Sequence, residues 1–304
     1  MRKKTGSEFV PSDEAEWIDR EGNLIDEDDR GLVYDVRTLV NRRNALGLFG
    51  GISVTALLAA CAPTATSATS TPTSSAAATS TPTATATPSP TAAAATPLDE
   101  VNDETGGPYP GDGSNGVNVL DDSGIVRSDI RSSFGSSTTV AQGVPLTIKL
   151  TVRTAATGAA LAGAAVYLWH CDKGGNYSLY SSGVENENYL RGVQQVDANG
   201  TVIFTSIYPA CYSGRWPHIH FEVYSDVATA VASGPIVKTS QIALPIEANT
   251  AVYATSGYEQ SVRNLSQISL ASDNVFRDDG GIHQLANMTG DVASGYTAAL
   301  TIGV

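Results

Sequence analysis

The sequence is short of positive charge, because its 304 residues contain 18 Lys and Arg against 31 Asp and Glu. A chain this acidic does not favour nucleic acid or a polybasic contact with a membrane, and we expect neither as a partner. Helical periodicity is scarce as well, which argues against a mainly helical fold. Long hydrophobic runs are also lacking, since the apolar segment from residue 45 to 60 is short for a helix that crosses a bilayer core of about 30 Å.

The N-terminal segment has the features of an export signal. Its polar part ends in Arg42 and Arg43, the apolar segment follows, and small residues lead to Cys61. This order predicts a twin-arginine lipoprotein signal peptide over residues 1–60, with Cys61 lipidated after cleavage. We therefore expect an exported lipoprotein at the cell surface or in the periplasm, attached to the membrane only through its lipid anchor. An uncleaved anchor helix is the alternative interpretation.

Residues 61–98 follow the signal and consist, after Cys61, almost entirely of Ala, Thr, Ser and Pro. This composition cannot bury a hydrophobic core, so we expect a disordered linker behind the lipidated cysteine. The first sixty residues hold 11 acidic and 8 basic side chains, so the cleaved chain would keep 20 acidic and 10 basic ones. The part from residue 99 to 304 is long enough for one domain with a substantial core.

The clearest strand signal lies in residues 144–152, where every second side chain is apolar. Short strand-like segments separated by Gly, Ser, Asn and Asp are typical of an all-β protein. We predict a β-sandwich of the immunoglobulin or transthyretin type, with long loops and little helix. The remaining strands are expected at 164–170, 201–208, 218–224, 238–244 and 296–303, and a helical turn or two at 257–265.

Two of the four histidines stand two residues apart, at His218 and His220. They begin a strand-like run, and in a strand positions i and i+2 share a face, so both imidazoles should point the same way. Such a pair is typical of a metal site, although exposed strands also carry it. Tyr212 and Arg215 precede the pair, and Pro217 places Arg215 in a turn before the strand.

A series of motifs surrounds this pair, and in this order it resembles the intradiol ring-cleavage dioxygenases, more narrowly their exported single-domain branch related to catechol and protocatechuate dioxygenases. The resemblance extends from about Thr105 to the end of the chain. The motifs are Gly107-Pro108-Tyr109, Arg127-Ser128-Asp129-Ile130, Trp169, Gly175-Asn176-Tyr177, Leu190-Arg191-Gly192, Asp197-Ala198-Asn199-Gly200, Pro209-Ala210-Cys211-Tyr212 and Arg215-Trp216-Pro217-His218-Ile219-His220.

The resemblance implies a β-sandwich that holds one mononuclear non-haem Fe(III). Its protein ligands would be Tyr177, Tyr212, His218 and His220, and Tyr212 would leave the ion when substrate binds. The chemistry of these residues agrees, because ferric iron is a hard cation that favours anionic oxygen and can deprotonate a phenol whose free pKa is near 10. A departing tyrosinate could then accept one of the protons that a catechol loses on binding.

The same resemblance implies the reaction. Arg215 would stabilise negative charge on the substrate, and Gln241 would line the pocket near substrate and O2. The enzyme would cleave catechol-type diols between the two hydroxylated carbons with O2, giving cis,cis-muconate-type products, in extracytoplasmic catabolism of aromatic compounds. The sequence decides neither the preferred catechol nor the oligomeric state.

The remaining aromatic residues and cysteines have more than one interpretation. Trp216 is a candidate for the pocket wall or for packing, and Tyr109 and Tyr180 are candidates for the pocket rim. Cys171 and Cys211 lie close in sequence to the two tyrosine ligands that the resemblance implies. They could form a disulfide in an exported protein, or remain two reduced buried thiols.

Two further functional classes stay open. The first is a non-catalytic surface lipoprotein that binds a partner or a polyphenol through its β-sandwich, with a vestigial metal site. The second is a copper or zinc protein built on His218 and His220. Glu222 extends this pair to a cupin-like His-x-His-x-Glu pattern, but that interpretation leaves Tyr212 and Arg215 unexplained.

Overall fold

The structure is a computed structural model that describes residues 96–304. The predicted signal peptide, the lipidation site Cys61 and the linker up to residue 95 lie outside the described residues. In the described part of the chain, no helix has the length and hydrophobicity needed to cross a membrane.

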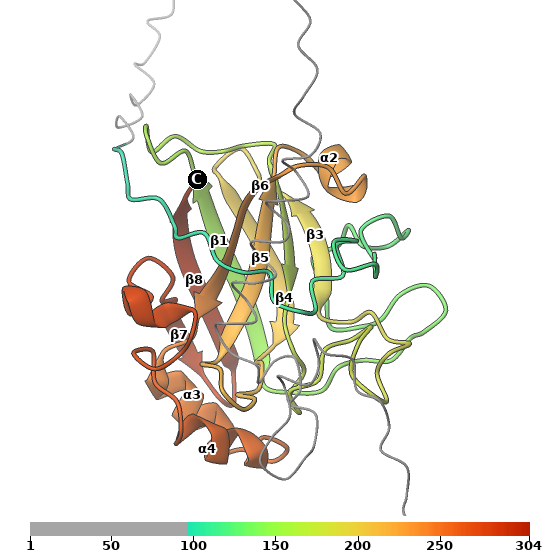
Figure 1. The fold of residues 1–304 in the computed structure, drawn as a ribbon, viewed down its shortest axis with the longest axis vertical. Coiled ribbons are helices and arrows are strands. Elements are labelled where there is room, and N and C mark those ends of the chain that lie inside the picture. The colour runs from blue at the N-terminus through green and yellow to red at the C-terminus, as the bar shows by residue number, and fades with distance from the viewer. Residues whose placement is uncertain (1–95) are drawn as a thin grey trace, which may run out of the picture. The chain divides into compact units, whose positions relative to one another are not determined.

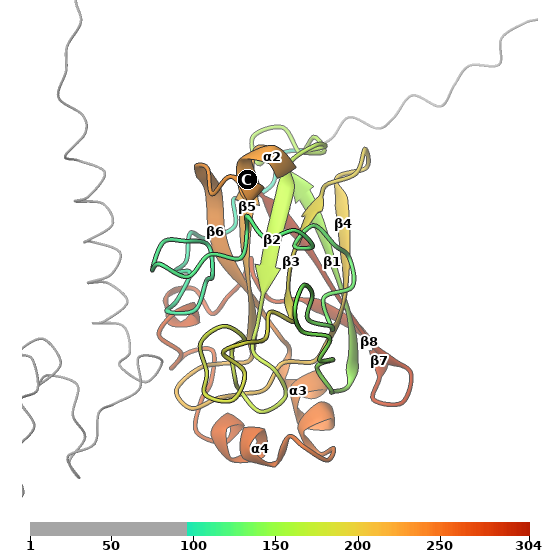
Figure 2. The ribbon, with the colours of Figure 1, turned by 90° about the vertical axis from the view of Figure 1, so that its right-hand side faces the viewer.

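The described residues form two four-stranded sheets, whose strands run along the vertical axis of Figures 1 and 2. Neighbouring strands are antiparallel except for β1 and β8, which pair in parallel. This architecture confirms the predicted all-β sandwich. The first sheet contains, in order, β4 (Thr201–Ile207), β1 (Pro145–Arg153), β8 (Gly295–Gly303) and β7 (Asn287–Asp291), and the second contains β3 (Arg191–Gln195), β2 (Ala165–Trp169), β5 (His218–Tyr224) and β6 (Ile236–Ala243).

Within residues 96–304, helix is limited to short segments between the later strands. Figure 1 shows α3 (Ile246–Tyr253) and α4 (Glu259–Leu265) side by side near one end of the sheets, and α2 (Val227–Val231) at the other end. A 3₁₀ turn, η3, covers Phe276–Asp278. The predicted helical turn at 257–265 corresponds to α4, whereas α2 and α3 were not predicted.

The hydrophobic core lies between the sheets, as the alternation in β1 indicates. Leu146, Ile148, Leu150 and Val152 are buried, while the residues between them are exposed or half-buried. Fully burying each of these side chains contributes about 1.5–3 kcal/mol relative to leaving it exposed. The side chains of the second sheet that join the same cluster are Val166, Leu168, Ile219, Phe221, Val223 and Ile242.

The outer face of the second sheet is also buried, because all residues of β2 and β5 are inaccessible. The covering segment is residues 104–111, which we call the strap, and it crosses in front of the sheet in Figure 1. The strap pairs with β6 through the Glu104 N–H, which donates to the Thr239 carbonyl at 2.8 Å. Further along, the Pro110 carbonyl accepts a hydrogen bond from the Tyr167 hydroxyl at 2.7 Å. Side chains on this face therefore lie in an enclosed layer.

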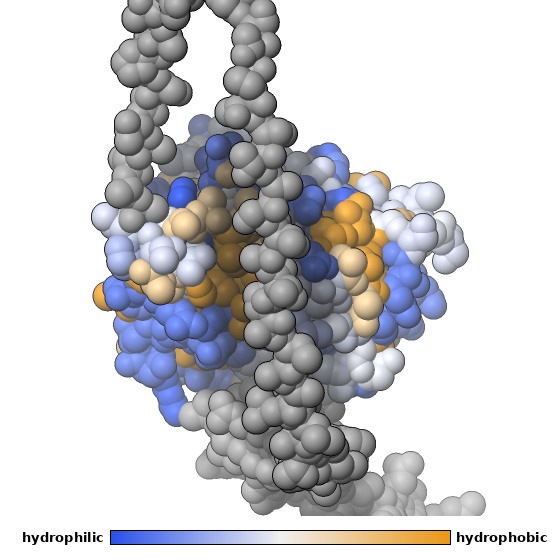
Figure 3. Space-filling model, turned by 90° about the horizontal axis from the view of Figure 1, so that it is seen from above, coloured by the Kyte–Doolittle hydropathy of each residue, from blue (hydrophilic) through white to orange (hydrophobic). Residues whose placement is uncertain are grey.

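The end of the sandwich near α2 has mixed polarity. Seen from above, hydrophobic side chains there adjoin hydrophilic ones (Figure 3). The Asp226 side chain caps α2 by accepting from the Thr229 N–H at 2.7 Å. Val227 and Val231 of α2 pack against the buried cluster on the outer face of the second sheet. The helix thereby closes one end of the layer that contains the histidine pair.

Candidate metal centre

His218 and His220 are placed by the alternation of β5. Ile219 and Phe221 point into the core between the sheets, so the two imidazoles share the outer face. Both are almost fully buried, with 2% and 3% of their surface exposed. Their Nε2 atoms lie 3.1 Å apart. The predicted orientation of the pair toward one point is confirmed.

Two tyrosines reach the same point from loops. Tyr177 lies between β2 and β3 and Tyr212 lies between β4 and β5, and their hydroxyl oxygens are 3.5 and 3.2 Å from His218 Nε2. Ligand atoms that are bound at about 2.0–2.1 Å to one ion lie about 3 Å apart when they are at right angles. The structure therefore brings together all four residues that the sequence analysis assigned to a metal, with spacings that fit a single ion.

Hydrogen bonding sets the orientation of the His218 ring. Its Nδ1 lies 2.6 Å from the Trp216 carbonyl, which can only accept, so Nδ1 carries the proton and Nε2 presents a lone pair. Burial, followed by the charge of Arg215, lowers the pKa of His218 well below its ordinary value. The imidazole is therefore neutral, as a metal ligand must be.

His220 is held by ring packing. The indole of Trp169 stacks on the imidazole with ring centroids 4.9 Å apart and planes 4° from parallel. Its Nδ1 is buried and has no hydrogen-bond partner among the described residues. Burial, followed by the charges of His218 and Arg215, lowers the pKa of His220 well below its ordinary value. A neutral imidazole fixed by stacking leaves Nε2 as the atom that faces the other donors.

This donor set fits a hard trivalent cation. It offers two phenol oxygens and two neutral imidazole nitrogens, and hard metal ions prefer such oxygen donors to thiolates. In the described part of the chain, no three His, Cys, Asp or Glu side chains cluster as a metal site. Glu222 therefore does not complete a triad with the histidines, and its carboxylate instead accepts a hydrogen bond from the Tyr224 hydroxyl at 2.6 Å.

Arg215 borders the centre as a buried cation. Its Nε donates to Asp273 Oδ2 at 3.1 Å and its Nη2 donates to Gln241 Oε1 at 2.7 Å. Burial works against the charged form, but Tyr212 and Asp273 outweigh it and raise the pKa of the guanidinium above its ordinary value. Gln241 is fixed in turn by the strap, since its Nε2 donates to the Thr105 carbonyl at 2.9 Å. Arg215 and Gln241, which were both predicted to take part in catalysis, are thus hydrogen-bonded to each other.

The three pocket candidates take different places. Trp216 is 5% exposed, donates through Nε1 to the Leu244 carbonyl at 2.9 Å, and packs in a small hydrophobic cluster of its own. The Tyr109 ring lies 5.0 Å from the ring of Tyr177 and 5.1 Å from that of Tyr180. The Tyr180 hydroxyl accepts from the Gly111 N–H at 2.8 Å, so this side chain braces the strap. Substrate contact stays a prediction for all three.

The candidate disulfide is not formed. Cys171 and Cys211 are both buried, and no disulfide joins them. Cys171 belongs to the cluster on the outer face of the second sheet, whereas Cys211 belongs to the core between the sheets. Their sulfurs also face different carbonyls, those of Ala210 and Arg215. Burial, with Asp273 nearby, raises the pKa of the Cys211 thiol to about 12. The alternative of two reduced buried cysteines is the one that the structure shows.

Two residues of the site were missed from the sequence. Trp169 was named only as part of the motif series, and the structure shows that it is fully buried and stacks on His220. The signal was available, because two adjacent antiparallel strands place Trp169 directly opposite His220. Asp273 was not singled out at all, since it lies 58 residues after Arg215 in a loop without a recognisable motif.

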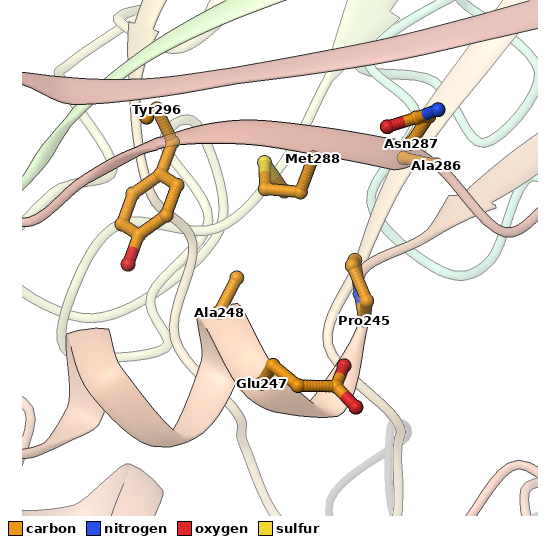
Figure 4. A pocket seen from close by; sticks show the side chains of 8 residues that line it. Pro245, Glu247, Ala248, Ala286, Asn287, Met288 and Tyr296 are labelled. Atoms are coloured by element: carbon orange, nitrogen blue, oxygen red, sulfur yellow. The ribbon is translucent and has the colours of Figure 1, made fainter.

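A separate cavity of about 500 Å³ lies between α3 and the strands β7 and β8 (Figure 4). None of the four predicted metal ligands lines it. Glu247, Asn287 and Tyr296 contribute polar groups, and Met288 contributes an apolar surface. The cavity is therefore distinct from the candidate metal centre.

Comparisons with known proteins agree with this geometry. The family model described as Dioxygenase matches residues 135–219. An intradiol ring-cleavage dioxygenase from Tetranychus urticae is 24% identical, with a TM-score of 0.50 over 60% of this chain and 87% of that chain. A second dioxygenase crystal structure is 24% identical, with a TM-score of 0.54 over 68% of this chain and 94% of that chain. A search of curated proteins found no match.

Proposed function

We propose, from the premise that this chain belongs to the intradiol ring-cleavage dioxygenases, that it holds one ferric ion and cleaves catechol-type diols with O2. One observation carries the proposal: two tyrosine oxygens meet two neutral histidine nitrogens at a single buried point. Ferric iron bound there would accept both oxygens of the diol as ligands and would promote reaction of the ring with O2.

The two tyrosines differ in how firmly they are held. Tyr177 is 1% exposed and packs against Tyr109, so it is suited to remain in place throughout the reaction. Tyr212 is half-buried and is followed by the exposed Ser213 and Gly214. Its side chain can therefore swing outward, and its phenolate oxygen can accept a proton from a catechol hydroxyl as it moves. This difference supports Tyr212 as the departing ligand.

Arg215 supplies a fixed positive charge beside the position that the substrate would occupy. Asp273 and Gln241 hold two of its nitrogens, so the guanidinium does not need to reorganise when negative charge develops on the diol. The reaction balances without another reductant, because the bond between the two hydroxylated carbons breaks and each new carboxyl group receives one oxygen atom from O2.

The test uses the purified protein loaded with ferric iron. We expect a burgundy colour from tyrosinate-to-iron charge transfer, O2 uptake with catechol, and a colourless muconate with one labelled oxygen in each new carboxyl after reaction with labelled O2. A yellow semialdehyde product would contradict intradiol cleavage. Full iron loading without O2 uptake on any catechol would favour the binding-protein alternative. A protein that stays colourless, as it would with zinc or an empty site, or that metal analysis shows to contain copper, would contradict the ferric site.

We further propose that the domain acts outside the cytoplasm, attached through lipidated Cys61. The support is the order of twin arginine, apolar segment and cysteine in the sequence. The Cys61→Ala variant should lose membrane partitioning in cell fractionation while the activity per folded molecule stays unchanged. Normal membrane retention of this variant would instead indicate an uncleaved anchor helix.

A further inference from the structure

Arg191 is the first residue of β3, and its guanidinium contacts Ser178, the residue that follows Tyr177. It is 1% exposed, and each of its five N–H groups has an acceptor. Nε donates to Ser178 Oγ at 3.1 Å, Nη1 donates to the Pro110 carbonyl at 2.8 Å and to the Tyr167 hydroxyl at 3.1 Å, and Nη2 donates to the carbonyls of Tyr109 and Ser178 at 2.9 Å each.

These acceptors are all neutral. In the part of the chain that the structure describes, no carboxylate forms an ion pair with Arg191. Burying a cation without a counter-ion is costly, so an ion pair does not explain why an arginine is buried at this position. What distinguishes Arg from Lys at such a place is the rigid fork of five donors, which can bind several acceptors in fixed directions at once.

The acceptors belong to chain segments that are far apart in sequence, and the guanidinium binds all of them at once. Two are in the strap, at Tyr109 and Pro110, and two are in Ser178, the residue directly after the predicted ligand Tyr177. The space for the fork is reserved by Gly111, where an added Cβ would lie 2.9 Å from Arg191 Nη1. One side chain therefore sets both the backbone beside Tyr177 and the strap that packs against its ring.

We propose that Arg191 is a positioning residue, which holds the Tyr177 phenol at the metal centre and locks the strap over it. The proposal rests on the proposed ferric site, because a fixed phenol direction matters there for the bond to the ion. Arg191 does not touch the four converging donor atoms. It acts through Ser178 on one side and through the Tyr109 ring, 5.0 Å from the Tyr177 ring, on the other.

The experiment compares Arg191→Lys with a matched control, Arg127→Lys. Arg127 also donates to backbone carbonyls, those of Ser132, Asn188 and Arg191, but its hydrogen bonds within the described chain reach neither the strap nor the segment 177–178. Both variants of the full chain are measured by thermal unfolding, by ferric iron titration of the metal-free protein, and by the wavelength of the tyrosinate charge-transfer maximum.

We expect Arg191→Lys to lower the affinity for ferric iron at least tenfold and to shift the charge-transfer maximum. Arg127→Lys should lower the melting temperature but leave both iron measurements at their wild-type values. In a Tyr212→Phe background, Tyr177 is the only tyrosine ligand left, so the shift caused by Arg191→Lys should be larger there. A merely structural role would change the melting temperature alone.

Two results would overturn the proposal: wild-type iron affinity and charge-transfer maximum in Arg191→Lys, or equal changes in both Lys variants. If Arg191→Lys does not fold, Tyr167→Phe takes its place, because it removes one acceptor of the guanidinium and keeps the guanidinium itself. A displaced charge-transfer maximum together with weaker ferric iron binding in Tyr167→Phe would then support the proposal, and wild-type values of both would refute it. A wild-type protein that takes up no ferric iron would refute the proposed function, and this inference with it.

Discussion

Asp273 organises the side of the site that faces Arg215. Its Oδ2 accepts from Arg215 Nε at 3.1 Å and from the Trp216 N–H at 2.6 Å. Its Oδ1 accepts from the N–H groups of Val275 and Phe276 at 2.8 and 3.1 Å. The Trp216 carbonyl binds Nδ1 of the predicted metal ligand His218, so Trp216 alone links the Asp273 carboxylate to that imidazole. It couples the charge of Arg215 to the backbone that orients His218.

The variant Asp273→Asn tests this arrangement. The amide can keep the oxygen that caps Val275 and Phe276, but its NH2 group then faces two donors in place of Oδ2. We expect a fall in kcat/KM of about 10- to 100-fold, equivalent to about 1.4–2.8 kcal/mol, with iron content unchanged. Breaking a buried pair should also lower the free energy of unfolding by about 3 kcal/mol.

The control for Asp273 is the exposed pair between Asp129 and Arg131, whose side chains are 50% and 42% exposed. Solvent screens this pair, so Asp129→Asn should change the free energy of unfolding by less than about 1 kcal/mol and leave kcat/KM unchanged. Wild-type kcat/KM in Asp273→Asn would show that Arg215 keeps its function without the carboxylate.

Predictability differs between residues of the same site. His218 and His220 could be placed from local spacing alone, since strand alternation is a short-range rule. The addition of Tyr177 required the family resemblance, because no periodicity joins a loop residue 41 positions away to His218. Asp273 and the proposed positioning role of Arg191 could be recognised only from the folded structure, because their partners come from segments that are far apart in the sequence.

The strap lies against the candidate metal centre at Gly107. An added Cβ there would lie 3.3 Å from Cε1 of His220, and the residue has a φ of +68°. Both facts favour glycine, because other residues are strained at positive φ and a side chain would press on the imidazole. The strap is therefore fitted to the ring that it covers.

Gly107→Ala and Gly135→Ala separate these two effects. Gly135 has a φ of +74°, but an added Cβ meets nothing within 4 Å. Both variants should lose about 1–2 kcal/mol of unfolding free energy from backbone strain. Only Gly107→Ala should also weaken ferric iron binding, because the methyl group displaces His220. Iron titration and thermal unfolding of both proteins provide the measurement, and equal iron affinities would contradict a close fit between strap and imidazole.

The strands and helices were predicted to unequal degrees for physical reasons. All six expected strands are present with ends shifted by at most two residues, because each has an apolar side chain at regular intervals. The strands β3 and β7 were missed, since their sequences, RGVQQ and NMTGD, carry little hydrophobic alternation and owe their conformation to pairing with neighbours. The helix α2 was missed because its sequence, VATAV, is rich in β-branched residues.

The two sheets are joined by hydrogen bonds as well as by the hydrophobic core. His170, directly after β2, places Nδ1 2.7 Å from the Cys171 carbonyl and Nε2 2.7 Å from the Ser206 hydroxyl of β4. Burial lowers the pKa of His170 from 6.5 to about 4, while the bond to Cys171 opposes the shift. A neutral imidazole thus bridges the layers of the sandwich.

This bridge predicts that the metal-free protein loses stability in acid. Between pH 6.5 and 4 the unfolded chain binds a proton at His170 and the folded chain does not, so the free energy of unfolding falls as the pH is lowered through this window. The contribution of His170 is about 3 kcal/mol, fully present above pH 6.5 and lost at about pH 4. Denaturant unfolding at a series of pH values measures it.

The comparison with His170→Asn isolates this contribution from opposing groups. Burial raises the pKa of Glu104 to about 7, so Glu104 stabilises the fold below pH 4.5 and loses that effect as the pH rises through 7, opposite to His170. Glu104 is unchanged in the variant, and its effect cancels in the difference. We expect His170→Asn to be less stable than wild type at pH 7, and the gap to narrow by about 3 kcal/mol toward pH 4. A gap that stays constant over this range would show that His170 is protonated in the folded protein at the same pH as in the unfolded chain.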